Sequence, residues 1–209
     1  MSREILENIK RKLYAESMGI CMNPNCKIEL FQSDGDIIEK AHIDPYCETA
    51  DNSYENLVVL CPNCHTKFDK LHQFAPEEVL NWKRIRSEEI DKFFAKKFKS
   101  FKSLKSEVFP LLLENKSIYE NYYLNEQKEL WDKFENKILI NNTKLKKLLE
   151  NNLNLFQSNS EKSYSNLHCI QTFIMHINEF EATRPDEEKK GQSLILCKPQ
   201  NWLQNDNII

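Results

Sequence analysis

Glycine is scarce in this sequence, because 209 residues contain only three: Gly19, Gly35 and Gly191. The glycine-rich loops that wrap nucleotide phosphates need several glycines within a few positions. The chain is therefore not expected to bind ATP through such a loop.

Long apolar runs are also missing from the sequence. It has no stretch of about 18 uncharged apolar residues, which excludes a membrane-spanning helix by this criterion. Residues 1–12 alternate apolar and charged side chains, where a secretory signal would carry an apolar block. Export is therefore not expected, and the predicted location is the cytoplasm.

Neither sign of charge is in clear excess, because 29 Lys and Arg stand against 32 Asp and Glu, for a formal net charge of -3. Apolar residues make up 40% of the chain and charged residues 29%, close to ordinary globular usage. This composition argues against disorder and predicts a folded core. Bulk charge gives no indication of a polyanionic partner.

The seven cysteines are unevenly placed, with five of them in the first third of the chain. Four of these form two close pairs, Cys21-Met-Asn-Pro-Asn-Cys26 and Cys61-Pro-Asn-Cys64. Zn2+ takes four thiolates tetrahedrally from two such turns, so the pairs predict a structural zinc site. Buried thiols without a metal are the alternative. Cys47 has no paired cysteine and is interpreted as an ordinary loop thiol rather than a fifth ligand.

The first third also changes its apolar pattern along the chain. A helix is expected between Ser2, as its N-cap, and Gly19, as its stop. Residues 36–43 and 56–60 have the short apolar runs of strands, and the polar segment 44–55 separates them. The sequence therefore predicts a β-hairpin between the two cysteine pairs.

The rest of the chain has helical periodicity. Pro76 suits the first turn of a helix that continues to about residue 98. Further helices are expected at residues 110–122, 126–140, 144–156 and 161–182. The expected breaks are at Asn141, Asn142 and Asn159, followed by a polar loop at residues 183–191 and a short strand at 193–197.

Three motifs lie within and just beyond the cysteine frame: Ala41-His42-Ile43-Asp44-Pro45, Asn56-Leu57-Val58-Val59-Leu60, and the segment from Cys61 to Asp69. Over about residues 20–72 the sequence resembles the HNH endonucleases, the ββα-metal or His-Me finger nucleases, in the form with a four-cysteine zinc frame. His42, Asn56 and His65 fall at the three positions that give the family its name.

The resemblance implies hydrolysis of DNA phosphodiester bonds with Mg2+ or Mn2+, giving 5'-phosphate and 3'-hydroxyl ends. The imidazole of His42 suits the general base. His65 and Asp69 are four residues apart on a helix, so they share a face and could hold the divalent ion. Asn56 offers both an amide donor and an acceptor, with which to fasten the loop and orient His42.

One position departs from the family pattern. The residue before the general base usually binds the metal, and here it is Ala41. Glu39 lies two residues earlier, on the same side of a strand, and is the candidate replacement, directly or through water. The alternatives are a weak or inactive zinc module that binds nucleic acid or a protein, and a nuclease that cleaves RNA.

The predicted fold class is α+β, with a zinc-stabilised, treble-clef-like ββα-metal unit followed by a mainly α-helical region. We expect an HNH nuclease domain at residues 1–100 and a helical domain for partner docking or oligomerisation at residues 101–209. Residues 83–102 carry eight basic and three acidic side chains, locally +5, which suits either phosphate contacts or a solvated face.

Partners are inferred from this layout. A nuclease with a net charge of -3 gains little long-range attraction to DNA, so a protein that brings it to its substrate is expected. The layout also resembles bacterial restriction and anti-phage defence components, which are often paired with an ATPase. The resemblance thus implies an ATPase as a separate chain.

Overall fold

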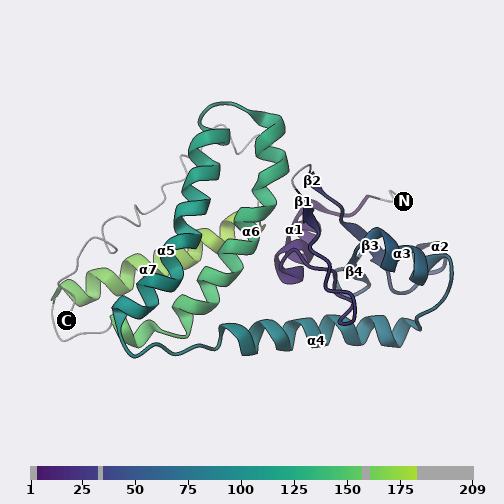
Figure 1. Ribbon diagram of the computed structural model, residues 1–209, viewed down its shortest axis with the longest axis horizontal. Coiled ribbons are helices and arrows are strands. Elements are labelled where there is room, and N and C mark those ends of the chain that lie inside the picture. Colours follow the sequence, from purple (N-terminus) through teal and green to yellow (C-terminus); the bar gives the residue numbers. More distant parts are fainter. Residues whose placement is uncertain (1–3, 33–34, 157–160, 183–209) are drawn as a thin grey trace.

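The computed structural model describes residues 4–32, 35–156 and 161–182. Its elements are α1 (Glu7–Ser17), β1 (Phe31–Gln32), β2 (Gly35–Asp36), β3 (Glu39–His42), α2 (Tyr46–Thr49), β4 (Leu57–Leu60), α3 (Pro62–Asp69), α4 (Pro76–Phe94), α5 (Phe101–Ile118), the π-helical turn Tyr119–Tyr123, α6 (Lys128–Glu150), the 3-10 turn Leu153–Phe156 and α7 (Glu161–Ala182). Figure 1 shows the strands with α2 and α3 at one end, α5 to α7 at the other, and α4 extending from one toward the other. The architecture is mixed and mainly helical, compatible with the predicted α+β class.

The predicted hairpin forms from β3 and β4, which pair antiparallel with Glu39 opposite Leu60 and His42 opposite Leu57. All four residues of β4 are buried, as a strand covered on both faces requires. The structure adds a second two-stranded pair, β1 with β2, and a single helical turn, α2, in the segment predicted as loop.

Helix α3 follows β4 directly and contacts both strands of the hairpin. Cys61 is its N-cap and accepts a hydrogen bond from the backbone N–H of Cys64, while Pro62 occupies the first turn. Cys64 and Phe68, four residues apart, form its buried face. This strand–strand–helix order carries the motif residues identified in the sequence.

Helix α1 begins later than predicted, at Glu7 with Leu6 as N-cap. The acidic side chain of Glu7 lies in the first turn, where it complements the helix dipole. Ser2, the predicted cap, lies outside the described residues. The end agrees better: Met18 and Gly19 take positive φ angles of 57° and 69°. A Cβ at Gly19 would approach the end of the Ile140 side chain, Cδ1, to 2.7 Å, so a substitution would strain the positive-φ backbone and displace this side chain.

The helix start predicted at Pro76 is confirmed, because α4 begins there. The start predicted for the helix at residues 110–122 is wrong. Helix α5 begins nine residues earlier, at Phe101. Ser100 caps it by accepting a hydrogen bond from the backbone N–H of Ser103. Pro110 lies inside the helix on its exposed side. The cap and the buried face together outweigh the break that proline favours.

The predicted break at Asn141 and Asn142 is also wrong, because both residues lie buried within the continuous helix α6. Asn142 accepts a hydrogen bond from the Asn115 side chain of α5 at 2.9 Å. The Asn141 amide donates to Asn115 at 2.9 Å and to Glu114 at 2.7 Å. Their amides bond across to α5 instead of competing for the α6 backbone, which removes the usual reason for asparagine to end a helix.

The last described helix, α7, has the predicted bounds of 161–182. The loop and strand predicted at residues 183–191 and 193–197, and the break at Asn159, lie outside the described residues. Among the described residues, no helix combines the length and the apolar character needed to cross a bilayer.

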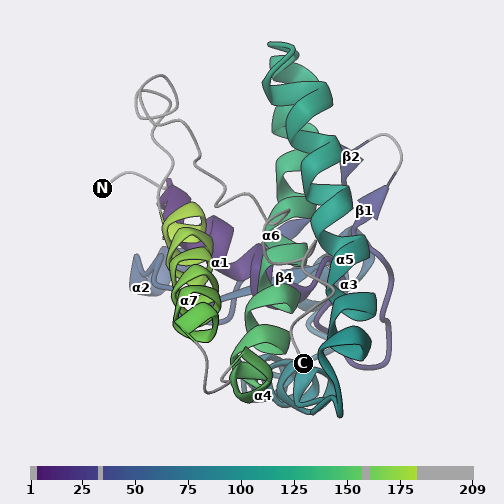
Figure 2. The same cartoon turned by 90° about the vertical axis from the view of Figure 1, so that its left-hand side faces the viewer.

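Helix α1 contacts both regions of the chain. It packs against β4 and α4 on one side and against α6 and α7 on the other. Figure 2 shows α7 alongside α1, although the two are far apart in sequence. The division at residue 100 stays a prediction, and α1, which lies in the first proposed domain, also contacts helices of the second.

Arg11 is the centre of this shared contact. Its side chain, 4% exposed, forms a buried ion pair with Glu135 of α6. The same guanidinium donates to the backbone carbonyls of Phe180 and Glu181 at the end of α7, where a cation also offsets the helix dipole. The aromatic ring of Phe180 lies 4.8 Å from the guanidinium carbon.

We expect Glu135→Ala to lower the free energy of unfolding by about 3–5 kcal/mol, because Arg11 would keep a buried charge without its carboxylate. Urea denaturation followed by circular dichroism measures this loss. Glu88→Ala is the matched control, because it removes the exposed partner of Arg84 and should cost less than about 1 kcal/mol. Equal losses in the two variants would contradict a special role for the buried pair.

Candidate active site and zinc frame

The four paired cysteines come together in the structure. Their sulfur atoms all lie within 4.8 Å of one another, and the sulfurs of Cys26 and Cys61 are 3.8 Å apart. Four sulfurs at about 2.3 Å from one Zn2+ lie roughly 3.8 Å from each other in a tetrahedron. Within the described ranges, no other group of three or more His, Cys, Asp or Glu side chains gathers in this way. The cluster is consistent with the predicted zinc frame.

Hydrogen-bond donors surround these sulfurs. The backbone N–H of Cys61 points to the sulfur of Cys21 at 3.3 Å, and that of Cys64 to the sulfur of Cys61 at 3.4 Å. The side-chain amide of Asn23, itself 5% exposed, donates to the sulfur of Cys64 at 3.4 Å. Donors of this kind stabilise negative charge on ligand atoms and fix their orientation.

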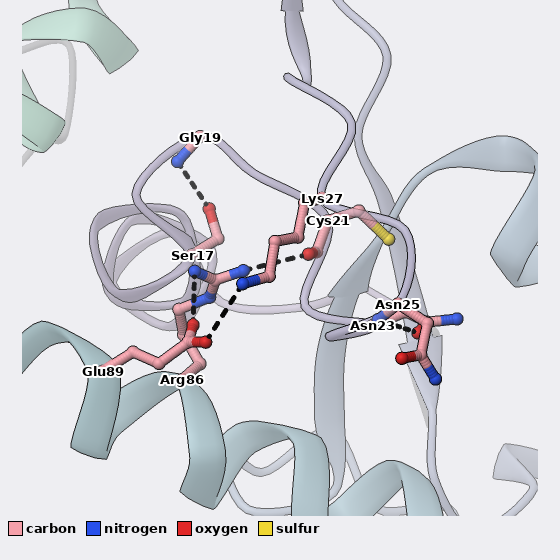
Figure 3. Close-up of polar contacts among 8 residues, drawn as sticks. All are labelled: Ser17, Gly19, Cys21, Asn23, Asn25, Lys27, Arg86 and Glu89. Atoms are coloured by element: carbon pink, nitrogen blue, oxygen red, sulfur yellow. Dashed lines mark hydrogen bonds and ion pairs between the residues drawn. The ribbon is translucent and has the colours of Figure 1, made fainter.

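The first cysteine turn is held by α4 as well as by its own backbone. Figure 3 shows Arg86 of α4 reaching the backbone carbonyl of Cys21, at 3.1 Å, while its guanidinium also pairs with Glu89 at 3.0 Å. Lys27, just after Cys26, approaches the same Glu89 carboxylate at 3.4 Å. These contacts join α4 to the frame, so the frame depends on a helix that lies outside the cysteine motifs.

Burial raises the pKa of the Cys64 thiol to about 11 and raises that of Cys21 further. Burial acts in the same direction on Cys61, but hydrogen bonds from Cys64, Cys26 and Cys21 outweigh it and lower its pKa. Several thiolates in one buried place are therefore costly without a cation. A tetrahedral divalent ion with a preference for sulfur removes that cost, so this donor set fits Zn2+.

Purified protein should therefore carry stoichiometric zinc, and Cys64→Ser should lose it together with a large part of its thermal stability. Metal analysis and thermal unfolding measure the two effects. Cys47→Ser is the control, because Cys47 is exposed on α2 and lies outside the cluster. Full zinc content in Cys64→Ser would show that this cluster is not the zinc site.

His42 is the last residue of β3, and its side chain is only partly buried. Its Nε2 atom lies 2.8 Å from the side-chain oxygen of Asn52, in the segment between α2 and β4. The Tyr46 ring packs beside the imidazole, with 5.2 Å between ring centroids. The ring is thus at the surface end of the hairpin and is held from two sides. Asn52 was not among the residues predicted from the sequence.

Asn56 is 6% exposed and bonds to both ends of the segment that follows His42. Its side-chain oxygen accepts from the Asp44 N–H at 2.8 Å, and its amide donates to the carbonyls of Asp44, at 3.1 Å, and Asp51, at 3.0 Å. These are the loop-fastening contacts expected of Asn56. Among the contacts recorded for the described residues, the polar partner of the His42 ring is Asn52 rather than Asn56.

Glu39 and His65 face each other across the start of β3 and the first turn of α3. A carboxylate oxygen of Glu39 lies 3.7 Å from Nδ1 of His65, and both side chains are accessible to solvent, 46% and 29% respectively. Asp69 is exposed at the last residue of α3. No polar contact among the described residues joins Asp69 or His42 to this pair. The structure thus brings together two of the predicted metal-site residues.

Ala41 is 1% exposed and belongs to the same core cluster as Val58 and Phe68. Side chains alternate between the two faces of a strand, so Glu39 lies on the Ala41 side of β3 and His42 on the other. The position that usually carries a ligand is therefore filled by a packed methyl group. Glu39 is the nearest carboxylate along that face of the strand.

Tyr54 is a further residue that the sequence did not indicate. Its hydroxyl donates to a carboxylate oxygen of Glu16 in α1. The ammonium groups of Lys12 and Lys83 lie 3.7 and 3.8 Å from the centre of its ring, and Lys83 donates to the Tyr54 carbonyl at 2.5 Å. Burial lowers the pKa of Lys83 to about 8, which still leaves it mostly protonated at pH 7. No signal within the motif could have found contacts so distant in sequence.

The basic stretch at residues 83–102 is partly neutralised by neighbouring acids. Arg84 pairs with Glu88 at 2.6 Å and Lys96 with Glu107 at 3.2 Å. Arg86 is buried against the first cysteine turn and is not accessible to a phosphate. The local +5 charge therefore overstates what this stretch can offer to nucleic acid, and phosphate contact there stays a prediction.

A model of the HNH endonuclease family matches residues 21–70. The match includes the four cysteines of the frame as well as His42, Asn56, His65 and Asp69. This segment is therefore similar to HNH endonucleases, which points to a nuclease-family function, and the match does not extend into the helical remainder of the chain. No curated protein and no solved structure matches the chain.

Proposed function

We propose that the protein is a metal-dependent endonuclease that hydrolyses phosphodiester bonds in DNA, with the zinc frame and the β3–β4–α3 unit forming a treble-clef-like ββα-metal site. The HNH match carries this proposal, because its three name-giving positions fall on the end of a hairpin strand, the loop anchor and the helix that follows. The zinc frame then has a structural role only.

The donors near the start of α3 suit a hard divalent ion. Glu39 and Asp69 offer carboxylate oxygens and His65 offers an imidazole nitrogen, the ligand types that Mg2+ or Mn2+ accept. The 3.7 Å separation of Glu39 and His65 is longer than a hydrogen bond and leaves both able to turn toward a shared ion or water. When bound, the ion stabilises negative charge on the phosphate and on the leaving oxygen.

The protein's own side chains carry out the remaining steps. His42 takes a proton from the attacking water, which requires a neutral ring held near the phosphate. Asn56 holds the loop that follows His42 closed through three hydrogen bonds. His65 and Asp69 hold the ion from the helix, and Glu39 adds a carboxylate in place of the ligand that Ala41 cannot supply.

The cellular role follows from charge and layout. The net charge of -3 gives weak attraction to DNA, so a protein that delivers the nuclease to its substrate supports its function. We assign that docking to the helical region and place the protein in bacterial anti-phage defence or restriction, in the cytoplasm, with an ATPase as a separate partner. Cleavage of RNA is tested in the same assays, because phosphate contacts do not distinguish the sugar.

A catalytically inactive zinc module is the second candidate, and the buried Ala41 favours it. A methyl group 1% exposed at a usual ligand position offers the ion nothing. In that case the HNH unit would bind nucleic acid or a protein without cleaving. The two candidates differ in whether any cleavage depends on His42.

Plasmid DNA incubated with purified protein and Mg2+ or Mn2+ should be nicked, and His42→Ala should slow nicking by roughly 10²–10⁴-fold, the usual contribution of a positioned general base. His176→Ala is the control, because His176 lies on α7 and pairs with Glu179. Equal nicking by wild type and His42→Ala would point to a contaminating nuclease. Absence of nicking in wild type, with DNA and with RNA, would favour the inactive module.

Glu39→Gln should raise the Mn2+ concentration that gives half-maximal rate by about tenfold or more, because the site loses a negatively charged oxygen. Cleavage rates measured over a series of Mn2+ concentrations report this shift. Glu48→Gln, an exposed carboxylate on α2, controls for the general loss of one negative charge. An unchanged Mn2+ dependence in Glu39→Gln would remove Glu39 from the site.

A further inference from the structure

The side chain of Asn52 has a definite orientation against His42. Its amide nitrogen donates to the backbone carbonyl of Glu4 at 3.4 Å, and a carbonyl oxygen can only accept. The amide oxygen is therefore the atom that lies 2.8 Å from Nε2 of His42. Since this oxygen also can only accept, Nε2 must carry the proton.

We propose that Asn52 is a positioning residue that holds His42 as the Nε2–H tautomer and leaves Nδ1 as the nitrogen that accepts the proton from water. This rests on the proposed function. A neutral imidazole has one N–H and one lone pair, so a donor at Nε2 places the lone pair on Nδ1. When Nδ1 takes the proton, water becomes the hydroxide nucleophile and the ring becomes a cation. Asn52 continues to accept from Nε2–H in both states.

The backbone on either side of Asn52 is anchored. On one side, the Asp51 carbonyl accepts from the buried Asn56 amide at 3.0 Å. On the other, Ser53 donates its N–H and its hydroxyl to the Asp51 carboxylate at 2.7 and 3.0 Å. Asn56 therefore acts on His42 indirectly, because it fixes Asp51 and with it the position of Asn52.

Two tyrosines complete the support. Tyr54, two residues after Asn52, is bound to Glu16 of α1 and to Lys83 of α4, which ties the segment to two helices. Tyr46 packs beside the imidazole and limits its rotation. The ring thus has a hydrogen bond at one nitrogen, an aromatic neighbour, and Nδ1 left for the reaction.

NMR of the full, zinc-loaded chain labelled with 15N-histidine reads the tautomer without requiring activity. The His42 signals are assigned by their loss in His42→Gln. We expect Nε2 to carry a proton protected from exchange with water and Nδ1 to be unprotonated. A neutral His42 ring protonated on Nδ1 would overturn the proposal.

Asn52→Leu keeps the size of the side chain but cannot accept a hydrogen bond. We expect the protected Nε2–H signal of His42 to disappear, and kcat to fall by roughly 10- to 100-fold, a part of the ~10²–10⁴-fold contribution of a positioned base, with little change in KM. Asn52→Asp restores an acceptor oxygen and should restore the protected signal. Asn154→Leu, an exposed asparagine after α6, is the matched control.

The outcomes separate the two proposals. A folded Asn52→Leu variant with unchanged His42 signals or unchanged kcat overturns the role of Asn52. A wild type that shows the Nε2–H tautomer but cleaves neither DNA nor RNA overturns the proposed function, while the tautomer assignment stands. Should Asn52→Leu fail to fold, Asn52→Ser is the second variant, because its shorter side chain leaves the same ring nitrogen without a partner.

Discussion

The convergence of four cysteine sulfurs within 4.8 Å is the constraint on which the N-terminal part of the chain depends. The segment between the two cysteine pairs is 34 residues long, from Lys27 to Leu60. In the part of it that the structure describes, the strands form two separate two-stranded sheets. A two-stranded hairpin is marginal on its own in water. A metal that closes the ends of this segment removes much of the chain entropy that the hairpin would otherwise have to overcome.

The loop from Asp44 to Asn56 depends on that frame in turn. It connects the paired strands β3 and β4, so the hairpin that the frame supports sets the distance between its ends. Within the loop, the buried Asn56 side chain satisfies three backbone groups that would otherwise need water or other partners. Tyr54 then connects the loop to α1 and α4. The geometry around His42 is therefore a property of a supported loop and not of single residues.

Much of this organisation is local in sequence, and it could be predicted for that reason. Both cysteine turns, the hairpin between them, the helix start at Pro76 and the bounds of α7 follow from spacing and periodicity over a few residues. The predictions were wrong where other interactions outweighed a local sequence signal. Asn141 and Asn142 read as a helix break, yet hydrogen bonds to α5 keep them inside α6, and the cap at Ser100 outweighs Pro110.

The sequence by itself determined the chemistry available: four thiolates in two turns, and His42, Asn56 and His65 in the order and spacing of an HNH unit. Only the tertiary structure decided which groups meet. It set Asn52 against His42 and Glu39 against His65, and it joined α1 to α7. The physical reason is that hydrogen bonds and ion pairs act over a few ångströms, and residues distant along the chain reach that range only after the core has packed.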